Sequence, residues 1–250
     1  MVGKGSRSGF AGRAVAVILG TMAALIMAGT IGTDGLSAQD SGLGGRWSIA
    51  LELGEIPMAG SFKAGISVGY HVSDEAWIGF AYQLPDSIRR GRHSFNAQGT
   101  GLEGLTGTRE GVGRRAYLQA RLRPTRWSPY LSLGVVFNDR DTETMVFDSR
   151  SREVDGATFS GPMEVTVSRP PGVRPALGLG YEYTSGGGFT AFVEWAGWWL
   201  RGAPTPEIRF LGSPPKSRFA SGLTTRIEDD FTGSPFNTYH LFQLGIGYTR

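Results

Sequence analysis

Thr-Tyr-His-Leu-Phe-Gln-Leu-Gly-Ile-Gly-Tyr, residues 238–248, is the stretch that decides the fold of this chain. Its large apolar side chains recur at every second position: Phe242, Leu244, Ile246 and Tyr248. The positions between them hold Gln243 and two glycines. Because successive side chains of a strand point to opposite faces, this period of two predicts a strand with one apolar and one small or polar face.

The same alternation recurs upstream, so the sequence predicts about eight strands. The further stretches are residues 46–53, 62–72, 76–84, 115–123, 129–138, 173–183 and 189–200. Tight links follow the second, fourth and sixth strands, whereas long links cover residues 85–114, 139–172 and 201–237. An even number of strands with alternating short and long links is typical of an all-β, up-and-down antiparallel transmembrane barrel.

This pattern resembles the small eight-stranded bacterial outer-membrane β-barrels of the outer-membrane protein A, X and W group, over about residues 44–250. In that family the terminal strand, here Phe242, Leu244, Ile246 and Tyr248, is an assembly signal. The resemblance implies a monomer that meets the barrel-assembly machinery and then outer-membrane lipid and lipopolysaccharide. It also implies a structural or surface-interaction role without catalysis.

The N-terminus predicts export. Lys4, Arg7 and Arg13 precede an apolar run over residues 14–31, and Leu-Ser-Ala follows at residues 36–38. Basic residues, an apolar run and a small residue before the cut are the marks of a secretory signal, so we expect residues 1–38 to be a cleavable signal peptide and residues 39–250 the barrel domain. The alternative is a single membrane-spanning helix. The chain has no Cys, which excludes disulfides, thiolate metal sites and a lipid-modified N-terminal cysteine.

Composition excludes some functions. Without residues 1–38 the basic and acidic residues nearly balance and form no basic stripe, so a nucleic-acid partner is not expected. No amphipathic helix of useful length is predicted after residue 38. The competing fold is a soluble barrel, but its outer polar face would be dense in Lys, Glu and Asp, whereas the polar faces here are mainly Gly, Ser, Ala and Gln.

Aromatic residues gather near the predicted strand ends. If the chain enters from the periplasm, Trp and Tyr side chains form a girdle at the membrane–water interface, where an apolar ring with a polar tip is favoured. The expected girdle is Trp47, Tyr70, Trp77, Trp127, Tyr181, Tyr183 and Tyr248 at the periplasmic rim, and Trp195 and Trp199 at the outer rim.

Charged residues occur at positions that alternate with the apolar ones, and therefore face the lumen: Glu52, Lys63, Arg121, Arg174, Glu182 and Glu194. A narrow lumen hydrates charges poorly, so these residues must pair. An eight-stranded barrel is about filled by its own side chains. We therefore expect an ion-paired plug, with a narrow channel for small solutes as the alternative.

The long links carry weaker signals. Arg89, Arg90 and Arg92 suit the phosphates of lipopolysaccharide, although a solvated loop has the same composition. Residues 145–147 and 165–167 are predicted to form a hairpin. Asp139, Asp141 and Glu143 are expected to lie in a solvated loop.

Catalysis has little support in the sequence. The nearest set of a nucleophile and a base is His93 and Ser94 with Asn96, and a lipid A-modifying enzyme is the second alternative. The His and Ser of lipid A deacylases lie two residues apart on a strand, whereas these two are adjacent. No cofactor and no metal site is predicted, because no cluster has ligand spacing.

Overall fold

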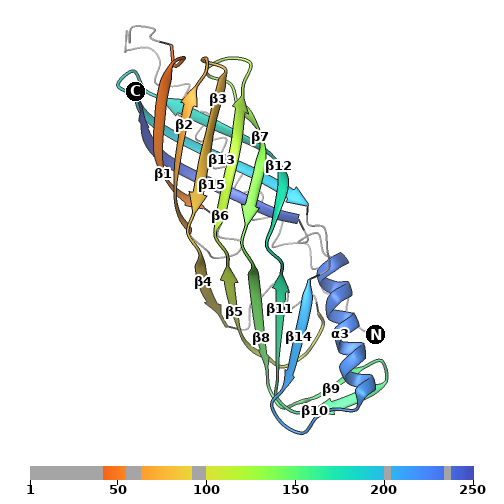
Figure 1. Ribbon diagram of the computed structural model, residues 1–250. Coiled ribbons are helices and arrows are strands. Elements are labelled where there is room, and N and C mark those ends of the chain that lie inside the picture. Colours follow the sequence, from red (N-terminus) through yellow and green to blue (C-terminus); the bar gives the residue numbers. More distant parts are fainter. Residues whose placement is uncertain (1–41, 55–62, 92–99, 200–203, 234–237) are drawn as a thin grey trace, which may run out of the picture. The chain divides into compact units, whose positions relative to one another are not determined.

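The computed structural model describes residues 42–54, 63–91, 100–199, 204–233 and 238–250. Eight strands close into an antiparallel barrel in the order β1-β15-β13-β12-β7-β6-β3-β2 (Figure 1). They are β1 (Arg46–Gly54), β2 (Lys63–His71), β3 (Ala76–Gln83), β6 (Arg115–Leu122), β7 (Tyr130–Asn138), β12 (Gly172–Thr184), β13 (Phe189–Trp199) and β15 (Thr238–Thr249). The predicted fold class and the eight predicted strands are confirmed.

The barrel wall is apolar outside and polar inside. Leu51 on β1 and Ile246 on β15 expose 67% and 58% of their surface, whereas the alternating Glu52 and Gln243 are buried. A water-soluble protein would bury the aliphatic side chains instead, so this inverted pattern is that of a wall facing lipid. Among the described residues, no helix is long and apolar enough to cross a bilayer.

The first and last strands, β1 and β15, close the barrel. β1 pairs with β15 from Ser48 opposite Thr249 to Gly54 opposite Gln243. Beyond these pairs, the Trp47 amide donates to the Arg250 carbonyl and the Arg250 amide to the Trp47 carbonyl, both at 2.7 Å. Every barrel strand therefore has two neighbours, and the barrel has no unpaired edge.

Trp77 is buried in the lumen, so its predicted place in the girdle is wrong. It alternates with Ile78 and Phe80, which point outward, and only 4% of its surface is exposed. Gly69 and Gly79 make room for its indole ring, since a Cβ atom at either position would lie 2.1–2.2 Å from a ring carbon. The indole nitrogen donates to Ser48 Oγ at 2.7 Å.

The described parts of the long links contain more strands than the one hairpin that the sequence predicted. A five-stranded sheet, which we call the extension sheet, has the order β14-β11-β8-β5-β4. Its strands are β4 (Asp86–Arg90), β5 (Leu105–Val112), β8 (Asp141–Phe147), β11 (Met163–Arg169) and β14 (Thr205–Phe210). This order repeats that of the barrel strands to which they connect, β13-β12-β7-β6-β3, so five of the eight barrel strands run on past the barrel (Figure 1).

The predicted hairpin of residues 145–147 and 165–167 is confirmed, because β8 and β11 pair with Met145 opposite Val165. Asp141 and Glu143, however, lie buried on β8. The expectation of a solvated acidic loop was therefore wrong at both positions. Asp141 is stabilised there by Arg115, whose Nη2 lies 3.0 Å from its Oδ2 atom.

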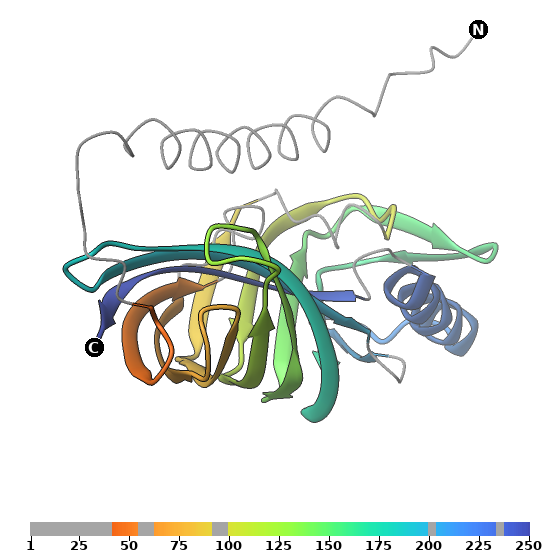
Figure 2. The same ribbon diagram turned by 90° about the horizontal axis from the view of Figure 1, so that it is seen from above.

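The helix α3 (Ser217–Gly233) was also not predicted. It lies beside the hairpin of β9 (Ser151–Val154) and β10 (Ala157–Ser160) (Figures 1 and 2). Its apolar side chains recur every fourth residue and pack into one core with the hairpin and the extension sheet. The residues of this core are Met145, Phe147, Val154, Ala157, Phe159, Met163, Val165, Val167, Phe219, Leu223, Ile227 and Phe231. The extension therefore has a hydrophobic core of its own.

Candidate functional site in the barrel lumen

Arg121 lies at the centre of a buried charge cluster in the lumen. Its Nη2 atom is 3.0 Å from Glu194 Oε2, and its Nη1 atom is 3.3 Å from Glu182 Oε2. The guanidinium also lies over the rings of Trp77 and Phe192, at 4.3 and 4.4 Å from their centroids. Two carboxylates and two aromatic faces thus hold this cation, which suits the planar guanidinium of Arg better than the ammonium of Lys.

Glu194 is fully buried and accepts hydrogen bonds from three neighbouring side chains. The Tyr130 hydroxyl donates to Oε2 at 3.0 Å, and the Ser132 hydroxyl donates to Oε1 at 2.7 Å. With its amide nitrogen turned toward the carboxylate, Gln119 donates to both oxygens at 3.0 and 3.1 Å. A buried charge with this many donors does not carry the penalty of an unpaired one.

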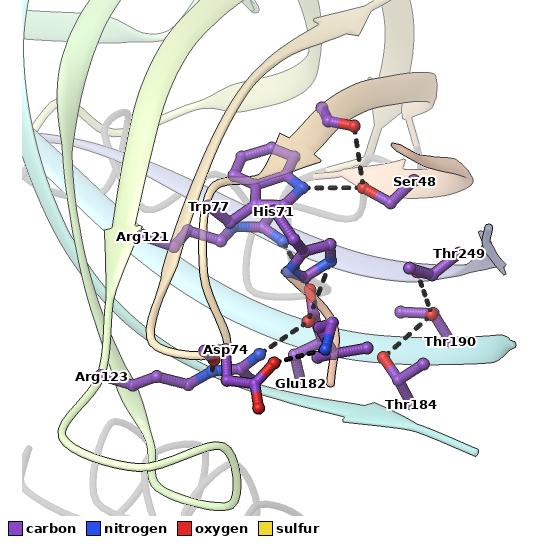
Figure 3. A network of polar contacts seen from close by, with 12 residues as sticks. Ser48, His71, Asp74, Trp77, Arg121, Arg123, Glu182, Thr184, Thr190 and Thr249 are labelled. Carbon is purple, nitrogen blue, oxygen red and sulfur yellow. Dashed lines mark hydrogen bonds and ion pairs between the residues drawn. The ribbon is translucent and has the colours of Figure 1, made fainter. Parts of the chain in front are cut away.

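Glu182 links the cluster to the end of the barrel that carries the tight turns (Figure 3). Its Oε1 atom lies 3.5 Å from Arg123 Nη2 and 3.9 Å from His71 Nε2. Arg123 also donates to the Asp74 carbonyl at 2.8 Å. A pocket about the size of one water molecule lies here, lined by Glu75, Trp77, Arg121, Arg123, Tyr130 and Glu182.

Glu52 lies in the same lumen with a neutral partner. Gln243 donates to its Oε2 atom at 3.0 Å, and both side chains are buried. Gln243 alternates with Phe242 and Leu244 of the predicted assembly strand, so one strand supplies both lipid-facing side chains and a lumen contact.

An apolar layer lies next to the charge cluster, toward the extension. Its residues come from six strands: Ala81, Tyr117, Val136, Ala176, Ala196 and Leu241. They lie beyond the polar cluster residues along the strands, as Val136 does beyond Ser132 and Ala196 beyond Glu194. The polar lining of the lumen is therefore interrupted by mainly apolar side chains, in which the Tyr117 hydroxyl is already bonded to Ser132 Oγ at 3.3 Å.

Lys63 and Arg174 are set apart from the Arg121 cluster. Lys63 is buried at the extension end of β2, where its ammonium donates to the Gly113 carbonyl. Arg174 is half-buried on β12 and donates to the Val173 carbonyl at 3.0 Å. The structure thus joins Arg121, Glu182 and Glu194 directly, with Glu52 bonded to Gln243 in the same lumen.

Three uncharged partners of the cluster were not predicted from the sequence: Gln119, Tyr130 and Ser132. Each follows or precedes an outward-facing leucine by one residue, so the period of two already placed all three in the lumen. Being uncharged, they were not considered as ion-pair partners, although buried carboxylates need such donors.

Most of the other girdle residues lie on the outer surface. Trp47 contacts Tyr70 with ring centroids 5.2 Å apart, and Trp127 contacts Tyr183 at 6.1 Å. Trp195 and Tyr248 are exposed. Tyr181 shares the outward alternation but is buried, opposite the buried Val193 on the neighbouring strand. Trp199 ends β13, and only its backbone is described.

The remaining predicted residues lie in or next to the extension. Arg89 and Arg90 are on β4, and Arg90 is described only in its backbone. Arg92, His93, Ser94 and Asn96 lie outside the described residues, as do residues 1–38. Among the described residues, no group of His, Asp and Glu side chains could hold a metal ion.

Comparison with known proteins identifies the fold. No protein-family model and no curated protein sequence matches the chain. The crystal structure of Acinetobacter baumannii CarO is similar, with a TM-score of 0.53 and 17% identity over 80% of this chain and 96% of that one. CarO2 from the same organism gives a TM-score of 0.59 and 15% identity over 82% and 99%. The fold is that of a small eight-stranded outer-membrane β-barrel. The structure of the outer membrane protein AlkL in lipid bilayers is less similar, with a TM-score of 0.38 and 15% identity over 87% of this chain and 96% of that one.

Proposed function

We propose that the protein is an outer-membrane β-barrel with a closed lumen, which serves a structural or surface-interaction role through its extension. The observation that carries this proposal is the filling of the lumen at Arg121. The guanidinium lies over the rings of Trp77 and Phe192 and bonds two carboxylates, and these contacts together fix its place in the lumen.

Closure of the lumen follows from two barriers in series. An ion entering from the turn end would have to separate Arg121 from Glu182 and Glu194, which costs several kcal/mol for buried charges. It would then meet the apolar layer, where Tyr117 and Leu241 are fully buried. Neither barrier offers a replacement for the hydration shell that the ion gives up.

The extension is the part of the protein that we assign to the cell surface. The start of β1, the end of β15 and the tight turns share one end of the barrel, and the extension continues from the other. Barrels of this class have short periplasmic turns and longer extracellular loops. Its core, built from the sheet, the hairpin and α3, supports a surface of fixed shape that suits recognition. Because barrel closure leaves no edge to pair, we expect a monomer.

Two measurements test the proposal. The full chain, expressed in a Gram-negative host, should fractionate with outer membranes and shift in gel mobility on boiling. In planar bilayers the purified barrel should show no steady conductance, whereas Tyr117→Ala/Leu241→Ala, which removes the two largest side chains of the apolar layer, should conduct more. A steady, ion-selective conductance of the wild-type protein would instead establish the channel. A mass shift of lipid A on overexpression would establish the enzyme.

A further inference from the structure

The extension sheet has a second face, opposite its buried core, which we call the outward face. Residues that pair across all five strands form two rows on this face. The row nearer the barrel holds Ser87, Gly111, Thr142, Ser168 and Thr205. The next row holds Arg89, Arg109, Thr144, Thr166 and Glu207. The outward face is therefore hydroxyl-rich, with two arginines at one side.

Arg89 and Arg109 lie directly opposite each other in the register of β4 and β5, and both are exposed. Directly opposed residues of antiparallel strands have Cβ atoms about 4.5–5.5 Å apart, and like charges there destabilise the pairing. Within the described part of the chain, neither guanidinium has a salt bridge with a carboxylate. An anion bound between them would turn this repulsion into attraction, and the Thr144 hydroxyl lies next to Arg109 in the same row.

The outward face continues the lipid-facing wall of the barrel. Leu84, Phe137 and Val173 are exposed apolar residues at the end of the wall from which the extension continues, and beyond them the two rows carry Ser, Thr and Arg, with Glu207 at the side far from the arginines. The hydrocarbon of a surrounding membrane therefore ends near Leu84. The rows above it face the polar layer of the same leaflet.

The height of the arginine pair selects the kind of headgroup. Arg89 lies five positions after Leu84, about 17 Å for a fully extended chain, or roughly 13 Å along the membrane normal at the usual strand tilt. The headgroup layer of an ordinary bilayer is only about 5–8 Å thick on each side. A phosphorylated saccharide extends far enough to place a phosphate at the height of the pair, whereas a phospholipid phosphate lies below the pair and is reached only if both arginine side chains bend toward the membrane.

We propose that Arg89 and Arg109, with Thr144 beside them, bind a phosphate group on the saccharide headgroup of an outer-leaflet glycolipid, as lipopolysaccharide carries. The site rests on the proposed outer-membrane location. The forked donors of two guanidiniums match the oxygens of one phosphate, and the row of hydroxyls suits the adjoining sugar.

The test measures binding of fluorescently labelled lipopolysaccharide to the purified full chain in detergent. We compare the wild type with Arg89→Gln/Arg109→Gln, and use Arg209→Gln as the matched control, since Arg209 is exposed on β14 opposite Glu164. The double variant should bind at least about tenfold more weakly, because two charge-assisted contacts are lost. The control should bind as the wild type does. Wild-type protein should bind dephosphorylated lipopolysaccharide as weakly as the double variant binds the intact form.

Several results would overturn the site. Equal binding by the double variant and the wild type would do so, as would an equal loss in Arg209→Gln, which would indicate a general effect of charge. Equal competition by phosphatidylglycerol vesicles would assign the phosphate to a phospholipid. If the double variant does not show heat-modifiable folding, Arg89→Lys/Arg109→Lys replaces it, and it should bind several-fold more weakly. Binding in detergent does not depend on cellular location, so a failure of this site is distinct from a failure of the outer-membrane assignment.

Discussion

Replacing Glu194 with Ala should strongly destabilise the barrel. The change removes the carboxylate that accepts from Arg121, Tyr130, Ser132 and Gln119. Breaking a buried ion pair by deleting one partner costs about 3–5 kcal/mol. Two features place the expected loss in the middle of that range, at about 4 kcal/mol. Arg121 keeps its contact with Glu182 at 3.3 Å, which lowers the cost, whereas the orphaned Tyr130 hydroxyl and Gln119 amide raise it.

The double variant Arg121→Ala/Glu194→Ala should be less damaged than the sum of its parts. Arg121→Ala alone should also cost about 4 kcal/mol, because it orphans Glu194. Removing both charges leaves Glu182 with Arg123 at 3.5 Å, so we expect about 5 kcal/mol for the double variant. The two single losses add up to about 8 kcal/mol, so the coupling energy between Arg121 and Glu194 is about 3 kcal/mol, at the upper end for residues in contact.

The free energies of unfolding would be measured by urea titration of tryptophan fluorescence, with the protein refolded into lipid vesicles. Glu207→Ala is the control, since Glu207 is exposed on the extension sheet and should change the free energy by less than about 0.5 kcal/mol. Additive effects of the two lumen mutations, each near zero, would refute the plug. Such values would mean that water solvates these charges in the lumen.

Four further changes test other parts of the structure. Ile246→Asp places a charge against lipid and should cost about 2 kcal/mol and lower the yield of heat-modifiable protein, whereas Ile246→Val should not. Gly79→Val should displace the Trp77 ring and weaken the near-UV circular dichroism, whereas Gly91→Ala, which adds a methyl group in open space, should leave it unchanged. Leu223→Ala should cost about 2–5 kcal/mol in the extension core and speed its proteolysis while the barrel stays closed, with the exposed Thr225→Ala as control. Hydrogen bonds from Arg150 hold the pKa of Asp148 below its ordinary value of 3.8. The contact between Asp148 and Arg150 should therefore be complete above pH 3.8 and be lost as the pH falls through the lowered pKa. In Arg150→Ala the pKa of Asp148, followed by NMR titration, should rise, and an unchanged pKa would contradict this cause.

The barrel could be predicted from the sequence because its signal is local. The period of two is visible within a few residues, as in Leu51 and Glu52 or in Ile246 and Gly247. It tells which side chains point outward and which point into the lumen without any long-range information. Trp77 was predicted wrongly because two rules disagreed. The period of two places it in the lumen, since the neighbouring Ile78 points outward, whereas its amphipathic ring favoured the membrane interface. Gly69, on another strand, provides the space for the Trp77 ring. Gly69 lies there because it pairs with Gly79, and that pairing depends on the register of β2 and β3.

The extension could not be predicted in the same way. Only part of the β8–β11 hairpin alternates clearly enough to be predicted, whereas a strand such as residues 105–112 contains two glycines and has no clean alternation. A signal for α3 was present, since Phe219, Leu223, Ile227 and Phe231 recur every four residues after Pro214 and Pro215. The intervening Gly and Thr residues are poor helix formers and hid it. Packing against the extension core stabilises this helix, and that core exists only once β8 and β11 have paired.

The pairing of β1 with β15 has a kinetic consequence. It joins residues about 200 positions apart, and the entropy of closing a chain of that length is worth about 5 kcal/mol. The local hairpins β2–β3, β6–β7 and β12–β13 avoid that cost, so they should form early and leave ring closure until last. Until then the molecule is an open sheet with two free edges and one apolar face, which is the form most prone to aggregate. Damage to the Trp47–Arg250 junction should therefore slow closure and lengthen the life of that open sheet, even where the finished barrel loses little stability.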